Sequence, residues 1–267
     1  MAPFKIMERI PESSTITKVS DLLEALSRIG RPASLNELAE VLAFPKPTLR
    51  RLLLQLKGVG MVMQDEDSRL YRLGSRLITL AAAVLEGMEV RRAASDILDD
   101  LMKATGESSY LAVLDQINSV YVDLVECDRS VKVLTKVGAR RLAWTTATGK
   151  VMLAFLPNEE RKRRLSAALR VSSAMTLPDP ALLAAQLRSI REAGFAVSRD
   201  EAEIGVTGVA APVLDAAGDC VAALALGIPT YRFSPALEAL TVEATVAAAE
   251  RLSERMKRLP SHTLAST

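Results

Sequence analysis

The sequence predicts an α+β protein built from two domains. Residues 16–74 combine three helical patterns with one short strand pair. From residue 90 onward, strand-like and helical runs are grouped rather than strictly alternating, as is typical of a domain with a mainly antiparallel sheet. A length of 267 residues with 49% hydrophobic and 25% charged residues suits two modest globular domains. We expect flexible ends at residues 1–15 and 259–267.

The first domain opens with two short helices. Thr17 or Ser20 can cap the first helix, and Gly30 ends it. Ser34 can cap the second helix, where Glu37 stands at the spacing of a capping-box partner. Apolar residues at helical spacing give each helix one hydrophobic side, so both helices are expected to pack on a small shared core.

The third helix, residues 45–57, carries the clearest functional signal. Four leucines at helical spacing form the side that faces the core, namely Leu49, Leu52, Leu53 and Leu56. The rest of the helix holds four cations with no acidic residue between them, together with a proline and a leucine: Lys46, Pro47, Arg50, Arg51, Leu54 and Lys57. Such a surface suits the phosphate-lined major groove of DNA, where Leu54 can contact a thymine methyl group. An ordinary amphipathic helix with a solvated basic side is the alternative.

A strand pair follows the third helix. Residues 61–63 and 69–73 have strand-like patterns on either side of a polar turn at residues 65–68. Helix, helix, turn, helix and hairpin is the element order of a winged helix-turn-helix. Arg69 and Arg72 are then candidates for contact with the DNA backbone or minor groove. Residues 1–76 carry 12 basic and 9 acidic residues, and the remainder carries 22 and 23, so the small positive excess lies in this domain.

Residues 75–89 are expected to form a helix that links the two domains. Its apolar positions recur at helical spacing and few charges separate them, as seen at Leu77, Leu80, Ala81, Val84, Leu85 and Met88. A helix with so broad an apolar surface needs a partner, which is either another part of this chain or a second subunit.

The second domain, residues 90–258, is expected to begin with a helix that ends at Gly106. Strands are predicted at residues 109–114, 120–126 and 131–137, with turns at residues 118–119 and 128–129. Helices at residues 148–156, 158–169 and 180–193, strands at residues 205–214 and 219–227, and a closing helix at residues 234–256 follow.

Three motifs of the first domain stand at residues 34–39, 47–53 and 70–74. With them, residues 16–74 resemble the N-terminal domain of the IclR family of bacterial transcription regulators. The resemblance implies that Ser34, Thr48 and Arg51 contact the DNA backbone or bases. Family members usually have Ser where this chain has Pro47, and often His where it has Arg50.

Three motifs of the second domain stand at residues 138–150, 194–205 and 210–218. They resemble the effector-binding domain of the same family, which has a GAF-like fold, so the resemblance extends over residues 16–256. The family usually has Pro-Leu-His where this chain has Leu142, Ala143 and Trp144. By the resemblance, this stretch lies beside the ligand cavity of the family.

The polar part of the candidate ligand site lies at the start of the helix predicted at residues 148–156. Thr146 and Thr148 offer hydroxyl groups, and the backbone N–H groups around Ala147 and Gly149 belong to the start of the helix. Because a helix N-terminus favours negative charge, a small organic acid would suit this site.

Further candidates surround this helix start. Trp144 can cover an aromatic ring or alkyl tail, and Ala211 and Ala223 can supply apolar lining. Asp200 and Glu201 lie on a loop where they can accept hydrogen bonds from a ligand hydroxyl. In the structural alternative, Trp144 fills the core, Glu201 caps a turn, and the alanines permit close strand packing.

Several other function classes lack their usual residues. His262 is the only histidine, stands in the polar tail, and is badly placed for a catalytic triad. Cys127 and Cys220 are far apart and form no zinc motif, so they are expected to be reduced thiols. We therefore expect no metal and no cofactor. No apolar run approaches the roughly 20 residues of a membrane span.

The resemblance implies a ligand-responsive, DNA-binding transcriptional regulator of a catabolic operon, and not an enzyme. It would act in the cytoplasm on a palindromic operator, as a homodimer or as a tetramer made of two dimers. A small organic or aromatic acid would be the effector, and RNA polymerase is a further candidate partner. In one alternative the second domain only oligomerises without a ligand. In another the chain is a hydrolase that uses Asp200, Glu201 and Lys150.

Overall fold

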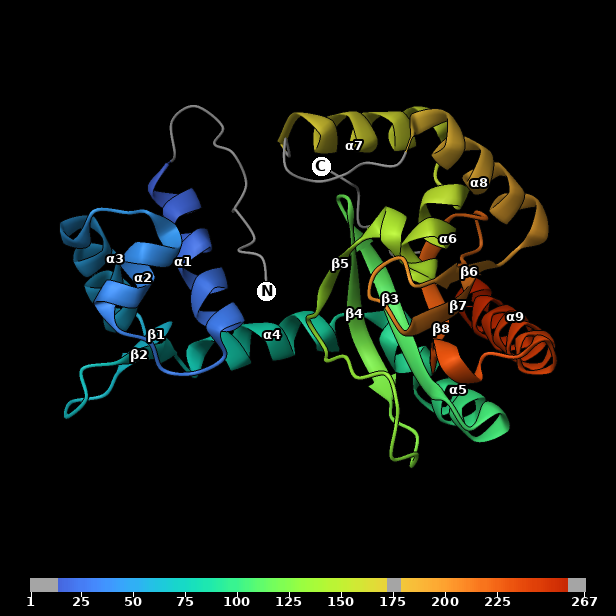
Figure 1. Cartoon of the computed structure of the whole chain (residues 1–267), viewed down its shortest axis with the longest axis horizontal. Coiled ribbons are helices and arrows are strands. Elements are labelled where there is room, and N and C mark those ends of the chain that lie inside the picture. The colour runs from blue at the N-terminus through green and yellow to red at the C-terminus, as the bar shows by residue number, and fades with distance from the viewer. Residues whose placement is uncertain (1–13, 172–178, 259–267) are drawn as a thin grey trace. The chain divides into compact units, whose positions relative to one another are not determined.

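The computed structural model describes residues 14–171 and 179–258, which fall into two compact units (Figure 1). The N-terminal unit extends to Gly87, and the C-terminal unit begins at Met88. Most of the two expected tails, residues 1–13 and 259–267 with His262, lies outside the described residues. Ser14 and Thr15, which were expected in the flexible N-terminus, instead belong to the first helix and its cap.

The N-terminal unit packs helices on a small antiparallel sheet. Its elements are α1 (Thr15–Ile29), α2 (Leu35–Leu42), α3 (Lys46–Gly58), β1 (Val62–Gln64) and β2 (Tyr71–Leu73). Leucines from α1, α2 and α3 form the core together with Val62 and Tyr71. Tyr71 and Ala33 exchange two backbone hydrogen bonds of 2.9 and 2.8 Å, which tie the sheet to the start of α2. The winged helix-turn-helix order is confirmed.

The N-terminal cap of α1 differs from the prediction. Ser14, and neither Thr17 nor Ser20, caps the helix, because the Ser14 Oγ accepts a hydrogen bond from the Thr17 N–H at 3.2 Å. The first turn of α1 is exposed and contributes nothing to the core. The apolar pattern therefore begins later than the helix. Because the prediction relied on that pattern, it placed the N-terminal cap several residues too late.

The predicted end of α1 and start of α2 are confirmed, apart from one contact. Gly30 ends α1 with a φ of 68°, and the Ser34 Oγ accepts from the Glu37 N–H at 3.2 Å. The Glu37 carboxylate does not close a capping box. It pairs with Arg31 at 2.6 Å, because the guanidinium group is a stronger partner than a backbone N–H.

In the β1–β2 hairpin, the first strand lies one residue later than the predicted 61–63, and the second is shorter than the predicted 69–73. Arg69 has a φ of 60° and belongs to the turn. The Asp65 Oδ1 accepts from the Ser68 N–H at 2.8 Å and from the Ser68 hydroxyl at 2.7 Å. The hydrogen bond from the Ser68 N–H is the main cause that lowers the pKa of Asp65. These local hydrogen bonds replace ladder pairing, so the returning strand begins only at Tyr71.

The linking helix is present as α4 (Arg76–Glu86), and none of its residues is buried. Ile78 and Val84 are 71% and 60% exposed, and Leu80 is 46% exposed. Among the described residues of its own unit, nothing covers the apolar surface of α4, and the partner that this surface needs stays a prediction.

The C-terminal unit is built on an antiparallel sheet in the order β5-β4-β3-β8-β7-β6. The strands are β3 (Ser108–Asp115), β4 (Asn118–Val125), β5 (Arg140–Leu142), β6 (Ala196–Arg199), β7 (Val206–Leu214) and β8 (Cys220–Pro229). The helices are α5 (Glu89–Thr105), α6 (Ala147–Phe155), α7 (Asn158–Val171), α8 (Pro180–Ala193) and α9 (Pro235–Arg258), with short 3-10 turns η1 (Ala143–Thr145) and η2 (Thr230–Arg232). The α+β class and the mainly antiparallel sheet are confirmed.

Helices cover both faces of this sheet (Figure 1). α6 packs on one face, and α5 and α9 pack on the other. β8 is buried along most of its length, as expected for a strand covered on both sides. The sheet residues beneath α6 are small, namely Ala112, Ala210, Ala223 and Ala225. They allow α6, itself almost wholly buried, to approach the sheet closely.

One strand prediction and one turn prediction in this unit are wrong. Residues 131–137 form no strand but belong to the β4–β5 connection, residues 126–139. Side chains take up its carbonyl groups: the Tyr110 hydroxyl donates to the Val133 oxygen at 2.6 Å, and Arg232 donates to the Val131 oxygen at 3.0 Å. The turn expected at residues 118–119 lies two residues earlier, where Gln116 has a φ of 55°. No described helix is both long and apolar enough to span a membrane.

Candidate DNA-binding surface and ligand cavity

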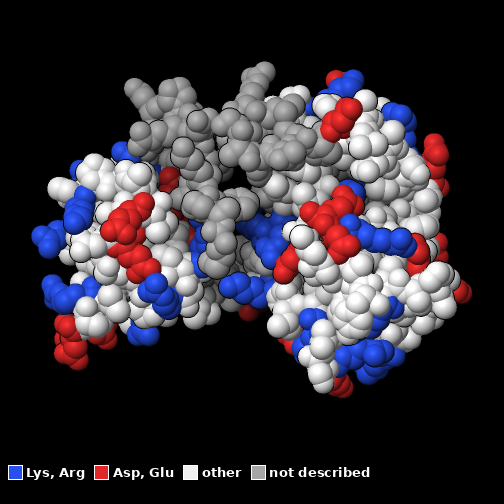
Figure 2. Space-filling view, in the orientation of Figure 1, with Lys and Arg blue, Asp and Glu red and all other residues white. Residues whose placement is uncertain are grey.

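α3 presents a basic surface to solvent. Its four predicted core leucines are buried, which turns the rest of the helix outward. Pro47 lies in the first turn, where its missing N–H breaks no helical hydrogen bond. The predicted DNA-binding residues of this helix are exposed, except that Thr48 is half-buried: Lys46, Pro47, Arg50, Arg51, Leu54 and Lys57. Figure 2 shows basic side chains along the α3 edge of this unit.

The cations of α3 form no ion pair with the residues of their own unit that the structure describes, which begin at Ser14. Among the described residues of this unit, the ion pair present joins Arg31 to Glu37 on other elements. Positive potential therefore persists over α3, as binding to a phosphate backbone requires. Ser34 is half-buried and its hydroxyl already caps α2, so a DNA contact there would share that hydroxyl.

The hairpin offers a mixed surface. Arg69 and Arg72 are exposed, as a DNA contact requires, but the tip between the strands carries Asp65, Glu66 and Asp67. Figure 2 shows acidic side chains gathered at the tip of the hairpin. The tip would repel phosphate, so any DNA contact by the hairpin falls to the two arginines.

A cavity of about 70 Å³ lies at the start of α6, against the sheet. Its lining comes from strands, from the first residues of α6, from the β4–β5 connection and from the β6–β7 loop: Tyr110, Tyr121, Val133, Thr135, Thr146, Ala147, Thr148, Ser198, Ala202, Val206, Gly208, Ala225, Leu226 and Gly227. None of these lining residues is charged. The cavity is therefore uncharged, and both its strand side and its helix side carry hydroxyl groups.

The helix start supplies donors at the cavity wall. The Thr146 Oγ1 caps α6 by accepting from the Gly149 N–H at 3.1 Å. N–H groups of a first turn have no acceptor inside the helix, which leaves those of Ala147 and Thr148. The hydroxyls of Thr148 and Ser119 are 2.8 Å apart, and the Ser198 hydroxyl donates to a backbone carbonyl at 3.1 Å. The N–H groups of Ala147 and Thr148 favour an anion that accepts hydrogen bonds.

Part of the predicted ligand site lies at this cavity. Three predicted residues line it, namely Thr146, Ala147 and Thr148. Gly149 does not line it but packs on η1, where a Cβ would lie 2.2 Å from the Ala143 Cα. Ala211 and Ala223 are buried within the sheet packing and do not line it either. For the two alanines, the structural alternative of close strand packing is correct.

Trp144 does not cover the cavity, contrary to expectation. η1 directs its ring into a cluster with Leu183 and Leu187 of α8, where the side chain is 3% exposed. Its Nε1 is buried without a hydrogen-bond partner in the described part of the chain. The alternative in which Trp144 fills the core is therefore correct.

Asp200 and Glu201 fix the β6–β7 loop and do not line the cavity. The Asp200 Oδ1 accepts from the Gly205 N–H at 2.7 Å and from the Thr230 hydroxyl at 3.0 Å. Glu201 forms an ion pair with Lys150, whose side chain is only 3% exposed. The loop that they hold carries Ala202, a lining residue, so both carboxylates act on the cavity indirectly.

The cavity residues that sequence reasoning missed come mostly from strands. Tyr110 of β3 and Tyr121 of β4 meet edge to face, with ring centroids 5.7 Å apart. Burial raises the pKa of both hydroxyls, so both stay protonated and can donate. These two of the four tyrosines of the chain stand among the aliphatic residues of β3 and β4. A tyrosine in such a strand was the available sequence signal for a polar site, because a buried tyrosine needs a partner for its hydroxyl.

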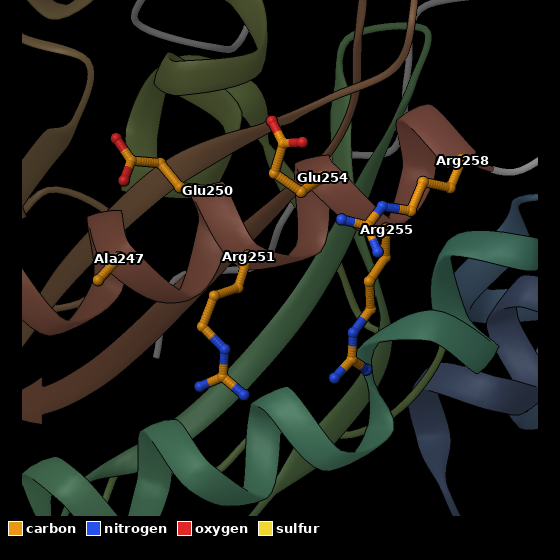
Figure 3. A pocket seen from close by; sticks show the side chains of 6 residues that line it. All are labelled: Ala247, Glu250, Arg251, Glu254, Arg255 and Arg258. Carbon is orange, nitrogen blue, oxygen red and sulfur yellow. The ribbon is translucent and has the colours of Figure 1, made fainter.

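An open groove also runs along α9, lined by Ala247, Glu250, Arg251, Glu254, Arg255 and Arg258 (Figure 3). Arg251 and Arg255 point toward α5, where they pair with Asp100 at 2.9 Å and Asp96 at 2.5 Å. The hydrogen bond from Arg255 holds the pKa of Asp96 at about 2. These charges join two helices to each other, so the groove offers little unmatched charge to a ligand.

Comparison with known proteins identifies both units. Residues 15–66 match the IclR helix-turn-helix domain, and residues 82–254 match the bacterial transcriptional regulator IclR C-terminal domain. The chain is 30% identical to the HTH-type transcriptional regulator KdgR of Escherichia coli (strain K12) over 230 residues, which are 85% of this chain and 87% of that protein. It is 33% identical to the probable transcriptional regulator SauR of Cupriavidus necator over 214 residues, 80% of this chain and 85% of that protein.

Solved structures agree with this assignment. The crystal structure of the Thermotoga maritima IclR is 29% identical, covers 91% of this chain and 98% of its own, and gives a TM-score of 0.68. An IclR homolog from Microbacterium hydrocarbonoxydans, complexed with 4-hydroxybenzoate, has the same fold, with 24% identity, a TM-score of 0.73, and 92% and 100% of the two chains covered. The chain therefore belongs to the IclR family of bacterial transcriptional regulators.

Proposed function

We propose that this chain regulates a catabolic operon and that its binding to DNA responds to a small organic acid. Membership of the family supports DNA binding and transcriptional regulation. The observation that carries the ligand-responsive part is the uncharged, hydroxyl-lined cavity at the start of α6. The homolog complexed with 4-hydroxybenzoate supports an acid as the ligand.

The DNA part of the proposal assigns α3 to the major groove of a palindromic operator in the cytoplasm, one helix per half-site. Residues on the outward side of α3 would read bases, namely Pro47, Thr48, Arg50, Arg51 and Leu54. Cations at its ends and on the hairpin would contact phosphate together with Ser34, namely Lys46, Lys57, Arg69 and Arg72.

A second copy of the chain is the proposed partner of α4. Two half-sites call for two recognition helices, and the uncovered apolar residues of α4 need a hydrophobic neighbour. The same helix of a second subunit supplies one by symmetry. The assembly would be a homodimer or a pair of such dimers.

The experiment that tests the proposal is fluorescence anisotropy with DNA from the promoter region of the protein's own gene. Binding is measured at two salt concentrations, with and without a panel of small organic acids. We expect sequence-selective, salt-sensitive binding that one acid alters. Specific binding that no acid changes would leave a regulator without a ligand, and the absence of specific binding in all conditions would refute the DNA-binding proposal.

Arg51→Ala is expected to weaken operator affinity by about 1–3 kcal/mol, roughly tenfold to a hundredfold, with the fold intact. Arg51 is exposed on α3, so its loss removes no core contact. The same assay measures the change. Arg28→Ala removes an exposed cation from α1 of the same unit and serves as the control. Equal affinity of the Arg51→Ala and Arg28→Ala proteins would remove Arg51 from the DNA-binding surface.

One acid of the panel is expected to raise the melting temperature of the full chain. A ligand that binds only the native state stabilises it by about 2.7 kcal/mol at a concentration of 100 times its Kd. The uncharged amide of the same acid is the control, because the helix N-terminus favours the carboxylate. A panel without any thermal shift would favour the alternative in which the C-terminal unit only oligomerises.

The hydrolase alternative has less support. Lys150 and Glu201 neutralise each other in an ion pair, and Asp200 is committed to the β6–β7 loop. The lining of the cavity contains no histidine, carboxylate, lysine or cysteine, and burial raises the pKa of Tyr110 and Tyr121, which keeps these two hydroxyls protonated and unsuited to act as a general base. We therefore propose a regulator without enzymatic activity.

A further inference from the structure

We propose that the cavity at α6 admits only a compact acid of about two to four carbon atoms, and that the Tyr110–Tyr121 pair sets this limit and excludes aromatic acids. The inference rests on the ligand-responsive function proposed above and specifies the class of its ligand. It narrows the choice between organic and aromatic acids that the sequence left open.

The volume of the cavity argues for a compact ligand. It measures about 70 Å³, whereas an engineered protein cavity that binds benzene measures roughly 150 Å³. A benzene ring with a carboxylate attached needs more room than benzene alone. An aromatic acid would therefore have to displace part of the wall, while a short hydroxy or oxo acid would not.

The tyrosine end of the cavity is held from several sides. The hydroxyl of Tyr110 donates to the Val133 oxygen of the β4–β5 connection at 2.6 Å. The Tyr110 ring lies over Gly227, where an added Cβ would be 2.8 Å from its Cε2 and 3.1 Å from the Val133 Cβ. Tyr121 packs edge-on against the same ring. Since Tyr110 is locked between the connection and β8, the pair is a fixed wall.

The helix end of the cavity provides the place for the carboxylate. Ala147 and Thr148 contribute N–H groups there, and no acidic side chain lines the cavity to repel an anion. Gly208 of β7 keeps this end open. An added Cβ at Gly208 would lie 3.3 Å from the Ala147 Cβ and 3.9 Å from the Ala147 nitrogen. A side chain at Gly208 would therefore occupy space next to the donors.

Isothermal titration of the full chain with four sodium salts tests this inference. Lactate and pyruvate are the compact probes, and benzoate and 4-hydroxybenzoate are the aromatic probes. We expect the wild-type protein to bind at least one compact acid at least tenfold more tightly than either aromatic acid. Aromatic acids that bind the wild-type protein as tightly as the compact acids would overturn the size limit and leave the proposed function standing.

Two variants change the cavity in opposite directions. Tyr121→Ala removes a ring from the wall and should raise the affinity for benzoate at least tenfold. Gly208→Ala fills the helix end and should weaken the binding of the compact acid at least tenfold. Tyr231→Ala removes a tyrosine that is 75% exposed and should change neither affinity. If Tyr121→Ala does not fold, the Gly208→Ala variant still tests where the carboxylate binds, and the comparison of acids on the wild-type protein still tests the size limit.

The remaining outcomes separate the two proposals. Unchanged compact-acid affinity in Gly208→Ala would overturn the assignment of the carboxylate to the helix end. If neither probe class binds, the size inference fails, and DNA anisotropy with the broader acid panel then decides whether the proposed function fails with it. Binding of a compact acid that changes the affinity for DNA would support both the size limit and the proposed function.

Discussion

Gly149→Ala is expected to destabilise the C-terminal unit by about 3 kcal/mol or more. An added Cβ would lie 2.2 Å from the Ala143 Cα and 2.3 Å from the Ala143 oxygen. These atoms belong to the backbone, so no side chain can rotate to make room. Overpacking in a core usually costs about 1–3 kcal/mol, and here α6 and η1 must separate as well. Urea denaturation followed by the fluorescence of Trp144, the single tryptophan, reports on this region.

Gly58→Ala is the matched control for this substitution. Gly58 ends α3, and an added Cβ there meets no heavy atom within 4 Å. Alanine at such a helical position is expected to be neutral or to stabilise by about 0.5–1 kcal/mol, measured by the circular dichroism of the full chain. A Gly149→Ala protein with wild-type stability would show that α6 does not approach η1 as closely as described.

Glu107→Leu is expected to cost about 3 kcal/mol of unfolding free energy. Glu107 is completely buried, and its two carboxylate oxygens accept from Arg232 at 2.8 and 2.6 Å. This hydrogen bonding raises the pKa of Arg232. Removing one partner of a buried pair costs about 3–5 kcal/mol. The lower end applies because Arg232 is 17% exposed and can regain some water.

The loss of the Glu107 carboxylate should also loosen the β4–β5 connection. Arg232 donates to the Val131 oxygen at 3.0 Å. The Nε of Arg129, in the same connection, lies 3.6 Å from the Glu107 Oε1. The double variant Glu107→Leu/Arg232→Met should recover part of the stability, because no charge is then left without its partner. Glu159→Leu, in an exposed pair with Lys162, should cost at most about 1 kcal/mol. Equal costs for Glu107→Leu and Glu159→Leu would contradict the structural role of Glu107.

The N-terminal unit was largely predictable because its helices have one apolar side each. The leucine spacing of α3 identified both the buried and the exposed residues correctly. The failures fall where side-chain chemistry, not periodicity, fixes the backbone. Ser14 caps a polar first turn that has no apolar pattern, and hydrogen bonds from Ser68 to Asp65 extend the hairpin turn beyond its expected end.

The C-terminal unit shows what one sequence pattern cannot distinguish. Alternating valines in residues 131–137 suggested a strand, but alternation does not reveal whether a neighbouring strand is available. Trp144 lies next to residues that line the cavity, yet η1 turns its ring away toward α8. The start of α6 was predicted to within one residue, at residue 148 where the helix begins at Ala147, because the signals that start a helix are local. The Tyr110–Tyr121 wall was not, since it depends on the register of β3 against β4.

The exposure of α4 couples its folding to the meeting of two subunits in the proposed homodimer. An isolated helix shorter than about 12–15 residues is marginal in water, and α4 has 11 residues, none of them buried. Below the concentration at which subunits associate, the segment would act as a flexible tether, and the two DNA-binding units would have no fixed spacing. Protein abundance would then determine whether a palindrome is occupied as one cooperative site or as two independent half-sites.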